Sequence, residues 1–391
     1  MDRHKDNAKW LIRFAPFRVL SVSGAYITPF FIQHGMSLWQ IFALQTIYSV
    51  AALAWEIPGG LIADKWGRAF AIKLSAPISG VMLVLYGLSS HYWQFALCEL
   101  ALAIGNGLYN GVDTALLADS LAAEGRSDQF TKLSQRIDAM GYAATALGVP
   151  AAFLLVKFVS INATIVADGL LTLIGMAFVY RLVEAPPLAA HEMLDARKSV
   201  WGAIKGMAGN VEARWLVALG SILSASTYMS FWLSTPYFVN LGIPAVAFGA
   251  ILAFRCLVKV AMLHFVKQTK HLERNMAAYT ALAGLTYLAM ATKLLWLAPS
   301  VLGHDAVQAL HAAPIKAALN QHIESRYRAT LNSAVSVIQR LLYAVAGPFI
   351  GLLADKRGLP FAFIATGIAC SLLACIALAR LHRLKTFQER S

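Results

Sequence analysis

Apolar stretches long enough to cross a lipid bilayer recur along the whole length of this 391-residue chain. A helix of about 20 mostly apolar residues spans the hydrocarbon, and only helices and closed barrels satisfy their backbone polar groups there. The alternating pattern of barrel strands is absent. The expected spans are 14–33, 38–63, 69–88, 92–116, 136–157, 161–182, 214–239, 244–266, 275–292, 296–319, 329–353 and 360–381. The sequence therefore predicts an all-α polytopic membrane protein with twelve transmembrane helices.

The composition excludes an ordinary water-soluble fold. Hydrophobic residues make up 58% of the chain and charged residues 14%, against about 25% charged residues in soluble domains. The four cysteines fall inside apolar runs, without a CxxC pair or a histidine at metal-binding spacing, and we interpret them as small core residues. No bound cofactor or metal is expected.

Lys and Arg residues test this topology, because basic residues near span ends stay preferentially on the cytoplasmic side. With the N-terminus inside, the connections and termini predicted to be cytoplasmic hold most of the 33 basic residues. The connections predicted to be external hold only Lys157, Lys293, Lys356 and Arg357. Both termini are thus predicted to be cytoplasmic, and the net charge of +13 reflects topology rather than a nucleic-acid partner.

The longest polar connection divides the spans into six and six. It predicts an N-terminal six-helix bundle over 1–183, a cytoplasmic linker over 184–213 and a C-terminal six-helix bundle over 214–391. Within the linker, a short amphipathic stretch from Trp201 to Met207 is expected to lie against the membrane. Two pseudo-symmetric halves are typical of transporters that rock one half against the other.

A specific motif stands between spans 2 and 3. The chain reads Gly60-Leu-Ile-Ala-Asp64-Lys65-Trp-Gly67-Arg68 there, preceded by Glu56-Ile-Pro58. This motif resembles the G-x-L-x-D-R/K-x-G-R/K signature of the major facilitator superfamily, and the E-x-P before it is similar to the bacterial permease and drug-efflux branches. The resemblance implies a cytoplasmic latch that gates the conformational switch, formed by Glu56, Gly60, Asp64, Lys65, Gly67 and Arg68. The alternative is a well-formed cytoplasmic turn.

Two further elements are less specific. A second copy of the motif, Gly351-Leu-Leu-Ala-Asp355-Lys356-Arg-Gly358, follows span 11 on the predicted external side, and we interpret it as a turn-forming echo of the repeat. Gly347-Pro348-Phe-Ile-Gly351 is similar to a bend of drug-efflux members, although plain helix packing accounts for it equally well. The arginine of proton-coupled members in span 4 is replaced by Ala101, so motifs leave the direction of transport open.

Three cationic residues fall within the spans of the second half. Arg255 and Lys259 lie one turn apart in span 8, and Arg340 lies near mid-depth in span 11. Charges in hydrocarbon are costly, so these residues either meet buried acids or form a site for an anionic group of the substrate. Lys259 has a third possibility, which is to extend its ammonium toward the cytoplasm.

Polar residues at helical spacing are the candidates for proton coupling and substrate contact. The resemblance implies that spans 1, 4, 7 and 10 line a central cavity. In span 10, Asp305, Gln308 and His311 share one face, and Asp305 with His311 is the first candidate for proton transfer; the alternative is a hydrated vestibule. Asp113 and Glu99 of span 4 are further proton candidates, although Asp113 could instead serve the gate. The resemblance places span 6 at the periphery, so Asp168 is expected to be an external-end residue or a member of a local pair. The remaining candidates for substrate contact are Tyr26, Tyr48, Asn106, Asn110, Tyr228 and Trp232.

These observations predict a monomeric secondary transporter of the bacterial inner membrane that moves a small organic solute by proton-driven alternating access. The chain has no phosphate-binding Walker loop. The first prediction is efflux of a drug-like compound or of a secreted metabolite such as a siderophore, and the alternative is uptake of an anionic metabolite or metal chelate. A membrane-embedded enzyme or non-transporting sensor is the third class, but no HExxH or paired-aspartate motif is present. The expected partners are the solute, protons and lipid.

Overall fold

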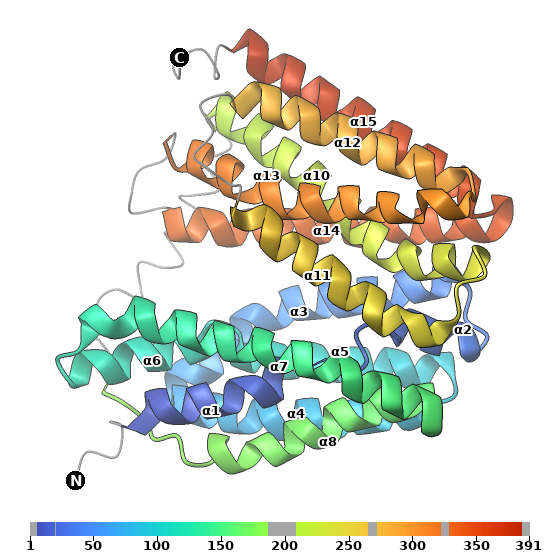
Figure 1. The fold of residues 1–391 in the computed structure, drawn as a ribbon. Helices are drawn as coiled ribbons and strands as arrows, with labels where there is room; N and C mark the ends of the chain where they lie inside the picture. Colours follow the sequence, from blue (N-terminus) through green and yellow to red (C-terminus); the bar gives the residue numbers. More distant parts are fainter. Residues whose placement is uncertain (1–5, 20, 187–208, 265–271, 322–327, 385–391) are drawn as a thin grey trace. The chain divides into compact units, whose positions relative to one another are not determined.

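The computed structural model describes residues 6–19, 21–186, 209–264, 272–321 and 328–384 (Figure 1). Most of the predicted linker, including Trp201 to Met207, lies outside the described residues. The described secondary structure is helical throughout. Its α-helices are α1 (Asn7–Val19), α2 (Ile27–Gln33), α3 (Leu38–Trp66), α4 (Arg68–Leu88), α5 (Tyr92–Tyr109), α6 (Val112–Ala123), α7 (Phe130–Phe158), α8 (Ile161–Val179), α10 (Val211–Asn240), α11 (Phe248–His264), α12 (Leu272–Ala291), α13 (Val301–Gln321), α14 (Arg328–Arg357) and α15 (Leu359–Arg383). Short 3₁₀ turns are η2 (Ser127–Gln129), η4 (Ala245–Ala247) and η5 (Leu295–Ser300).

The chain divides into two compact units. The first unit comprises residues 1–36, 44–190 and 245–250, and the second comprises residues 37–43, 191–244 and 251–391. The start of α3 therefore belongs to the second unit and the rest of this helix to the first.

The predicted twelve-helix architecture is confirmed, because each expected span coincides with one helix or with two consecutive helices. Eight spans are long and apolar enough, by length and composition, to cross a membrane. Many large apolar side chains remain exposed, among them Leu147, Trp296 and Phe349. Such exposure suits a protein whose surroundings are lipid rather than water.

Two of the predicted spans are interrupted, which corrects the sequence analysis. Span 1 was expected as one helix over 14–33, but α1 ends at Val19 and α2 begins only at Ile27. Span 4 breaks between α5 and α6 at Gly111, whose φ of 82° is a left-handed conformation that glycine adopts without strain. The hydrophobic pattern continues through both interruptions, so hydropathy alone does not reveal them.

Small residues bring α4 and α8 together in the first unit, where the two helices lie side by side (Figure 1). A Cβ atom added to Gly169 of α8 would lie 2.6 Å from the backbone nitrogen of Val84 and 2.7 Å from the carbonyl oxygen of Gly80. Helices in lipid associate through close packing rather than through the hydrophobic effect, and glycines at the interface allow that approach.

The second unit has its own apolar core. The side chains of α10, α12, α13 and α15 supply it, with Leu219, Met276, Val307 and Ala374 among its fully buried members. Tyr287 of α12 donates a hydrogen bond from its hydroxyl to the carbonyl oxygen of Ser226 at 2.6 Å, which ties α12 to α10.

We predict that Gly169→Ala destabilises the first unit. The new methyl group would meet backbone atoms of α4, which cannot rotate away, and overpacking of this kind costs about 1–3 kcal/mol. The apparent melting temperature of the purified protein in detergent should fall. Gly60→Ala is the matched control, because no atom lies within 4 Å of its added Cβ in α3. Equal melting temperatures for the two variants would contradict the packing account.

Candidate functional site

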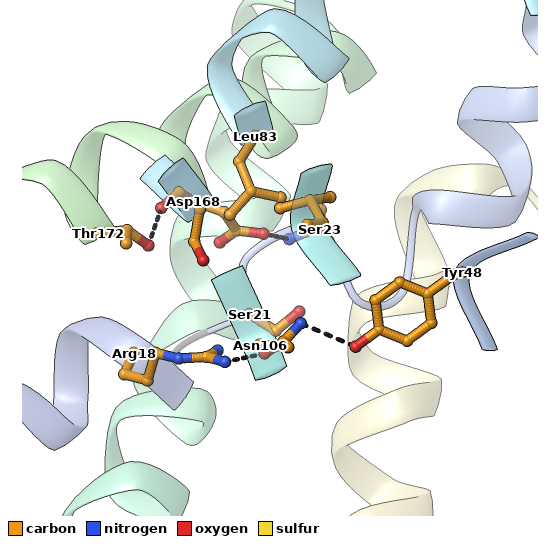
Figure 2. A pocket seen from close by; sticks show the side chains of 10 residues that line it. Arg18, Ser21, Ser23, Tyr48, Leu83, Asn106, Asp168 and Thr172 are labelled. Carbon is orange, nitrogen blue, oxygen red and sulfur yellow. Dashed lines mark hydrogen bonds between the residues drawn. The ribbon is translucent and has the colours of Figure 1, made fainter. Parts of the chain in front are cut away.

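A carboxylate from α8 accepts hydrogen bonds from the backbone at the interruption of the first span. The backbone N–H group of Val22 donates to one oxygen of Asp168 at 2.7 Å. The backbone N–H group of Ser23 donates to the other at 3.0 Å (Figure 2). Broken helices are tolerated within a membrane only where other groups satisfy the freed backbone. Asp168 is buried and does so here. The expectation of an external-end residue or a local pair did not include this link to the first span.

A polar pocket of about 280 Å³ opens beside this interruption, entirely within the first unit. Side chains from α1, the α1–α2 connection, α3, α4, α5 and α8 surround it (Figure 2). They are Arg18, Ser21, Ser23, Tyr48, Ser79, Leu83, Leu102, Asn106, Asp168 and Thr172. The pocket therefore joins one guanidinium and one carboxylate with several hydroxyl groups.

A chain of hydrogen bonds orients one wall of the pocket. The Arg18 guanidinium donates to the amide oxygen of Asn106, whose Nδ2 donates to the hydroxyl oxygen of Tyr48 at 2.8 Å (Figure 2). Arg18 also lies over the ring of Tyr109, 4.9 Å from its centroid. The structure thus places the predicted Tyr48 and Asn106 together and adds Arg18 and Asp168, which were not predicted as site residues.

The other predicted residues of the first unit lie outside this pocket. Glu99 is buried in α5, where its Oε1 accepts from the Tyr86 hydroxyl at 2.8 Å and from Gln45 Nε2 at 3.2 Å. Tyr26 is fully buried. Asn110 is exposed and Asp113 half-buried, next to the interruption of span 4.

In the second unit, one acid is shared by two cationic side chains. The Asp305 carboxylate of α13 accepts hydrogen bonds from Arg255 Nε at 2.7 Å and from Arg255 Nη2 at 3.1 Å, which makes the ion pair bidentate. Lys259 Nζ lies 3.2 Å from the same carboxylate. Arg255 also donates from Nη1 to the Ser234 hydroxyl at 2.9 Å. Both Arg255 and Asp305 are buried, so the geometry brings together the cations of span 8 and the acid of span 10.

The histidines of α13 form no hydrogen bond with this cluster among the described residues, although His304 interacts electrostatically with Arg255. His311 Nε2 is 3.0 Å from the Ser224 hydroxyl, and its Nδ1 is 2.6 Å from the Val307 carbonyl oxygen. His304 is buried against the ring of Tyr287, and neither of its ring nitrogens has a hydrogen-bond partner among the described residues.

Other candidates of the second unit are not joined to the cluster. Arg340 is exposed on α14 and forms no ion pair with any residue that the structure describes. Tyr228 is exposed beside the ring of Tyr343, whereas Trp232 and Gln308 are half-buried.

The motif between spans 2 and 3 forms a tight connection from α3 to α4. Gly67 adopts a φ of 104°, and a Cβ atom there would lie 2.6 Å from Glu184 Oε2. The Glu184 carboxylate accepts the backbone N–H groups of Arg68 and Ala69, both at 2.8 Å, at the start of α4. Negative charge is favourable at a helix N-terminus. The sequence analysis missed Glu184, although it stands just after span 6 as an acid at a span end.

The arginine of this motif forms a largely buried ion pair. Arg68 contacts the carboxylate of Asp119 on α6 and donates to the Ala115 carbonyl oxygen at 2.9 Å. Of the other residues of the motif, Glu56, Asp64 and Lys65 are exposed, and a Cβ atom added to Gly60 would have no neighbour within 4 Å. Arg68 and Gly67 therefore carry the contacts of the motif in this conformation.

The second copy of the motif is more than a turn. Gly358 has a φ of 85° and supplies the expected turn, but the Asp355 carboxylate also accepts the N–H groups of Leu38 and Trp39, at 2.9 and 2.8 Å. These two residues begin α3 and belong to the second unit with Asp355. The same type of cap is thus found at the starts of α3 and α4.

Comparisons with known proteins agree with this fold. The family model of the Major Facilitator Superfamily matches residues 14–341. Similar solved structures include the nucleoside transporter NupG (13% identity, TM-score 0.77, 96% of this chain and 99% of that one). They also include a bacterial homologue of the human lysosomal transporter Spinster (15% identity, TM-score 0.70, 98% and 96% covered) and the POT family transporter PepTSo (13%, 0.69, 98% and 99%). No curated protein matches the sequence.

We predict that the pair of Arg68 and Asp119 is strongly coupled. Removing one partner of a buried ion pair leaves an uncompensated charge and costs about 3–5 kcal/mol, so Arg68→Ala and Asp119→Ala should each lower the apparent melting temperature in detergent. The double variant should recover part of the loss. Asp6→Ala serves as control, because its pair with Lys9 is exposed and worth about 1 kcal/mol or less. Additive losses in the double variant would exclude the coupling.

Proposed function

The chain belongs to the major facilitator superfamily, and from that premise we propose that it couples proton movement to the transport of a small organic solute carrying an anionic group. Membership makes it a multi-pass membrane transporter that works by alternating access, and not an enzyme. The anionic substrate class and the proton coupling are our proposal. We also propose that the protein is a monomer of the bacterial inner membrane with both termini in the cytoplasm.

The observation that carries this proposal is the sharing of Asp305 by Arg255 and Lys259. With all three groups ionised, the cluster holds two positive charges and one negative charge. A buried net charge in low dielectric is unfavourable unless a further group compensates it. A carboxylate or phosphate of the solute supplies that charge, and the planar guanidinium of Arg255 suits either group.

Protonation of Asp305 links the solute to the proton. A neutral Asp305 no longer forms ion pairs with the Arg255 guanidinium and the Lys259 ammonium, so both cations become available to an anionic solute. Binding of a proton frees the two cations for the solute, and a bound anionic solute favours the neutral form of Asp305. The proton and the solute therefore increase each other's affinity. Linkage of this sign favours symport, and an inward proton gradient would drive uptake.

Efflux of a drug-like compound or secreted metabolite is the second candidate. It is favoured by the resemblance of residues 56–68 to drug-efflux members and by Pro348, which lies inside α14 next to the close approach at Gly351. The nucleoside and POT family transporters with similar folds share 11–16% identity with this chain, which transfers the fold and no substrate.

We predict that anionic compounds stabilise the protein more than their neutral esters. Thermal unfolding in detergent should be measured with benzoate against methyl benzoate and with succinate against dimethyl succinate, since ligands that bind the folded form raise its melting temperature. Arg255→Gln should abolish the difference within each pair. The matched control is Arg380→Gln at the exposed end of α15, which should retain it. Equal stabilisation by acids and esters would contradict an anion-binding site.

We further predict that a compound which stabilises the protein takes up protons as it binds. The pH of a weakly buffered solution of purified protein should rise when that compound is added, and Asp305→Asn should remove the rise. Proton release would favour antiport, and therefore the efflux candidate, over the symport proposed here.

A further inference from the structure

The pocket of the first unit contains two opposite charges that are not paired with each other. Arg18 and Asp168 both line it, and neither forms a direct ion pair with a described residue, although Arg18 interacts electrostatically with Asp113. An unpaired charge within a membrane span is costly and is a functional candidate by default. Two such charges of opposite sign in one pocket make the pocket complementary to a ligand that carries both signs.

Asp168 is held in place and still has capacity to bind. Its two oxygens accept the backbone N–H groups of Val22 and Ser23, and the Ser23 side chain is a further hydrogen-bond partner. A carboxylate offers about four acceptor positions, so about one remains for a ligand. The side chain is 6% exposed and that exposure faces the pocket that it lines.

Arg18 is likewise oriented by neutral partners. One guanidinium N–H bonds to Asn106, and the group makes a cation–π contact with the Tyr109 ring, so two neutral side chains set its direction. Four further N–H donors remain in a planar fork that matches the two oxygens of a carboxylate.

The remaining lining limits the size and polarity of a ligand. Ser21, Ser23 and Ser79 present hydroxyl groups, and Leu83 and Leu102 are the apolar members. A volume of about 280 Å³ corresponds to about nine water molecules at about 30 Å³ each. The space therefore suits a compound of about that many non-hydrogen atoms.

From these observations we propose that the pocket at the interruption of span 1 binds a small zwitterion, with its carboxylate on Arg18 and its ammonium on Asp168. This inference goes beyond the proposed function, because the pocket and the Asp305 cluster lie in different units and share no residue. The pocket accepts its ligand whether or not Asp305 carries a proton.

The test uses ω-amino acids of increasing length, namely glycine, β-alanine, γ-aminobutyrate and 5-aminovalerate, on the purified full chain in detergent. Binding is measured by calorimetry and by thermal stabilisation. At least one member should bind about tenfold or more tightly than the butyrate and butylamine controls, which carry a single charge each. The series is also measured in Arg255→Gln, which removes the anion site of the second unit. In that variant, butyrate or butylamine binding as tightly as the best zwitterion would overturn the proposal, as would the absence of binding by the whole series.

Variants assign that binding to the pocket. Arg18→Gln should weaken zwitterion binding about tenfold or more and leave butylamine binding unchanged. Because Asp168→Asn also disturbs the backbone of span 1, Leu102→Trp provides a second route by filling the pocket, with exposed Leu97→Trp of the same helix as its control. Loss of binding in Arg255→Gln but not in Leu102→Trp would place the ligand elsewhere. This pattern separates a failure here from a failure of the proposed function.

Discussion

A polar group inside a membrane span must find its partner within the protein, because hydrocarbon offers none. The backbone shows this constraint at the interruption of span 1, where the buried Asp168 carboxylate accepts two successive N–H groups. The same type of cap recurs at two more exposed span ends, with Asp355 at the start of α3 and Glu184 at the start of α4. Each acid is far in sequence from the amides that it binds. These caps therefore determine where helices begin and where one of them is broken.

The same constraint acts on charged side chains and produces the two candidate sites. In the second unit, Asp305 compensates Arg255 and Lys259 only in part, and the excess positive charge motivates an anionic solute. In the first unit, Arg18 and Asp168 are held by neutral hydrogen-bonding groups rather than by ions, which leaves their charges for a ligand. Glu99 is also held by neutral side chains, Tyr86 and Gln45, but it does not line the pocket of the first unit.

Hydropathy and the motif at residues 56–68 were sufficient to predict the twelve spans and the family. They did not predict the interruption of span 1, since Ser21 to Gly24 remain apolar or small enough to continue a helix pattern. They also missed the link between Asp168 and the first span, because the acid and the Val22 amide are 146 residues apart and span order suggested a peripheral position. That Arg255 meets a buried acid was among the alternatives, although Asp305 was not named as that acid. The separation of Arg340 from this pair depends on helix rotation, which spacing alone does not determine.

The central claim is that Asp305 is the acid that exchanges protons with the surrounding solution during transport. Charge displacement after a pH jump, recorded from protein reconstituted on a solid-supported membrane, tests it without knowledge of the solute. The account predicts a transient current in the wild-type protein and in Glu99→Gln, and none in Asp305→Asn. A current that persists in Asp305→Asn, or that disappears in Glu99→Gln alone, would contradict it.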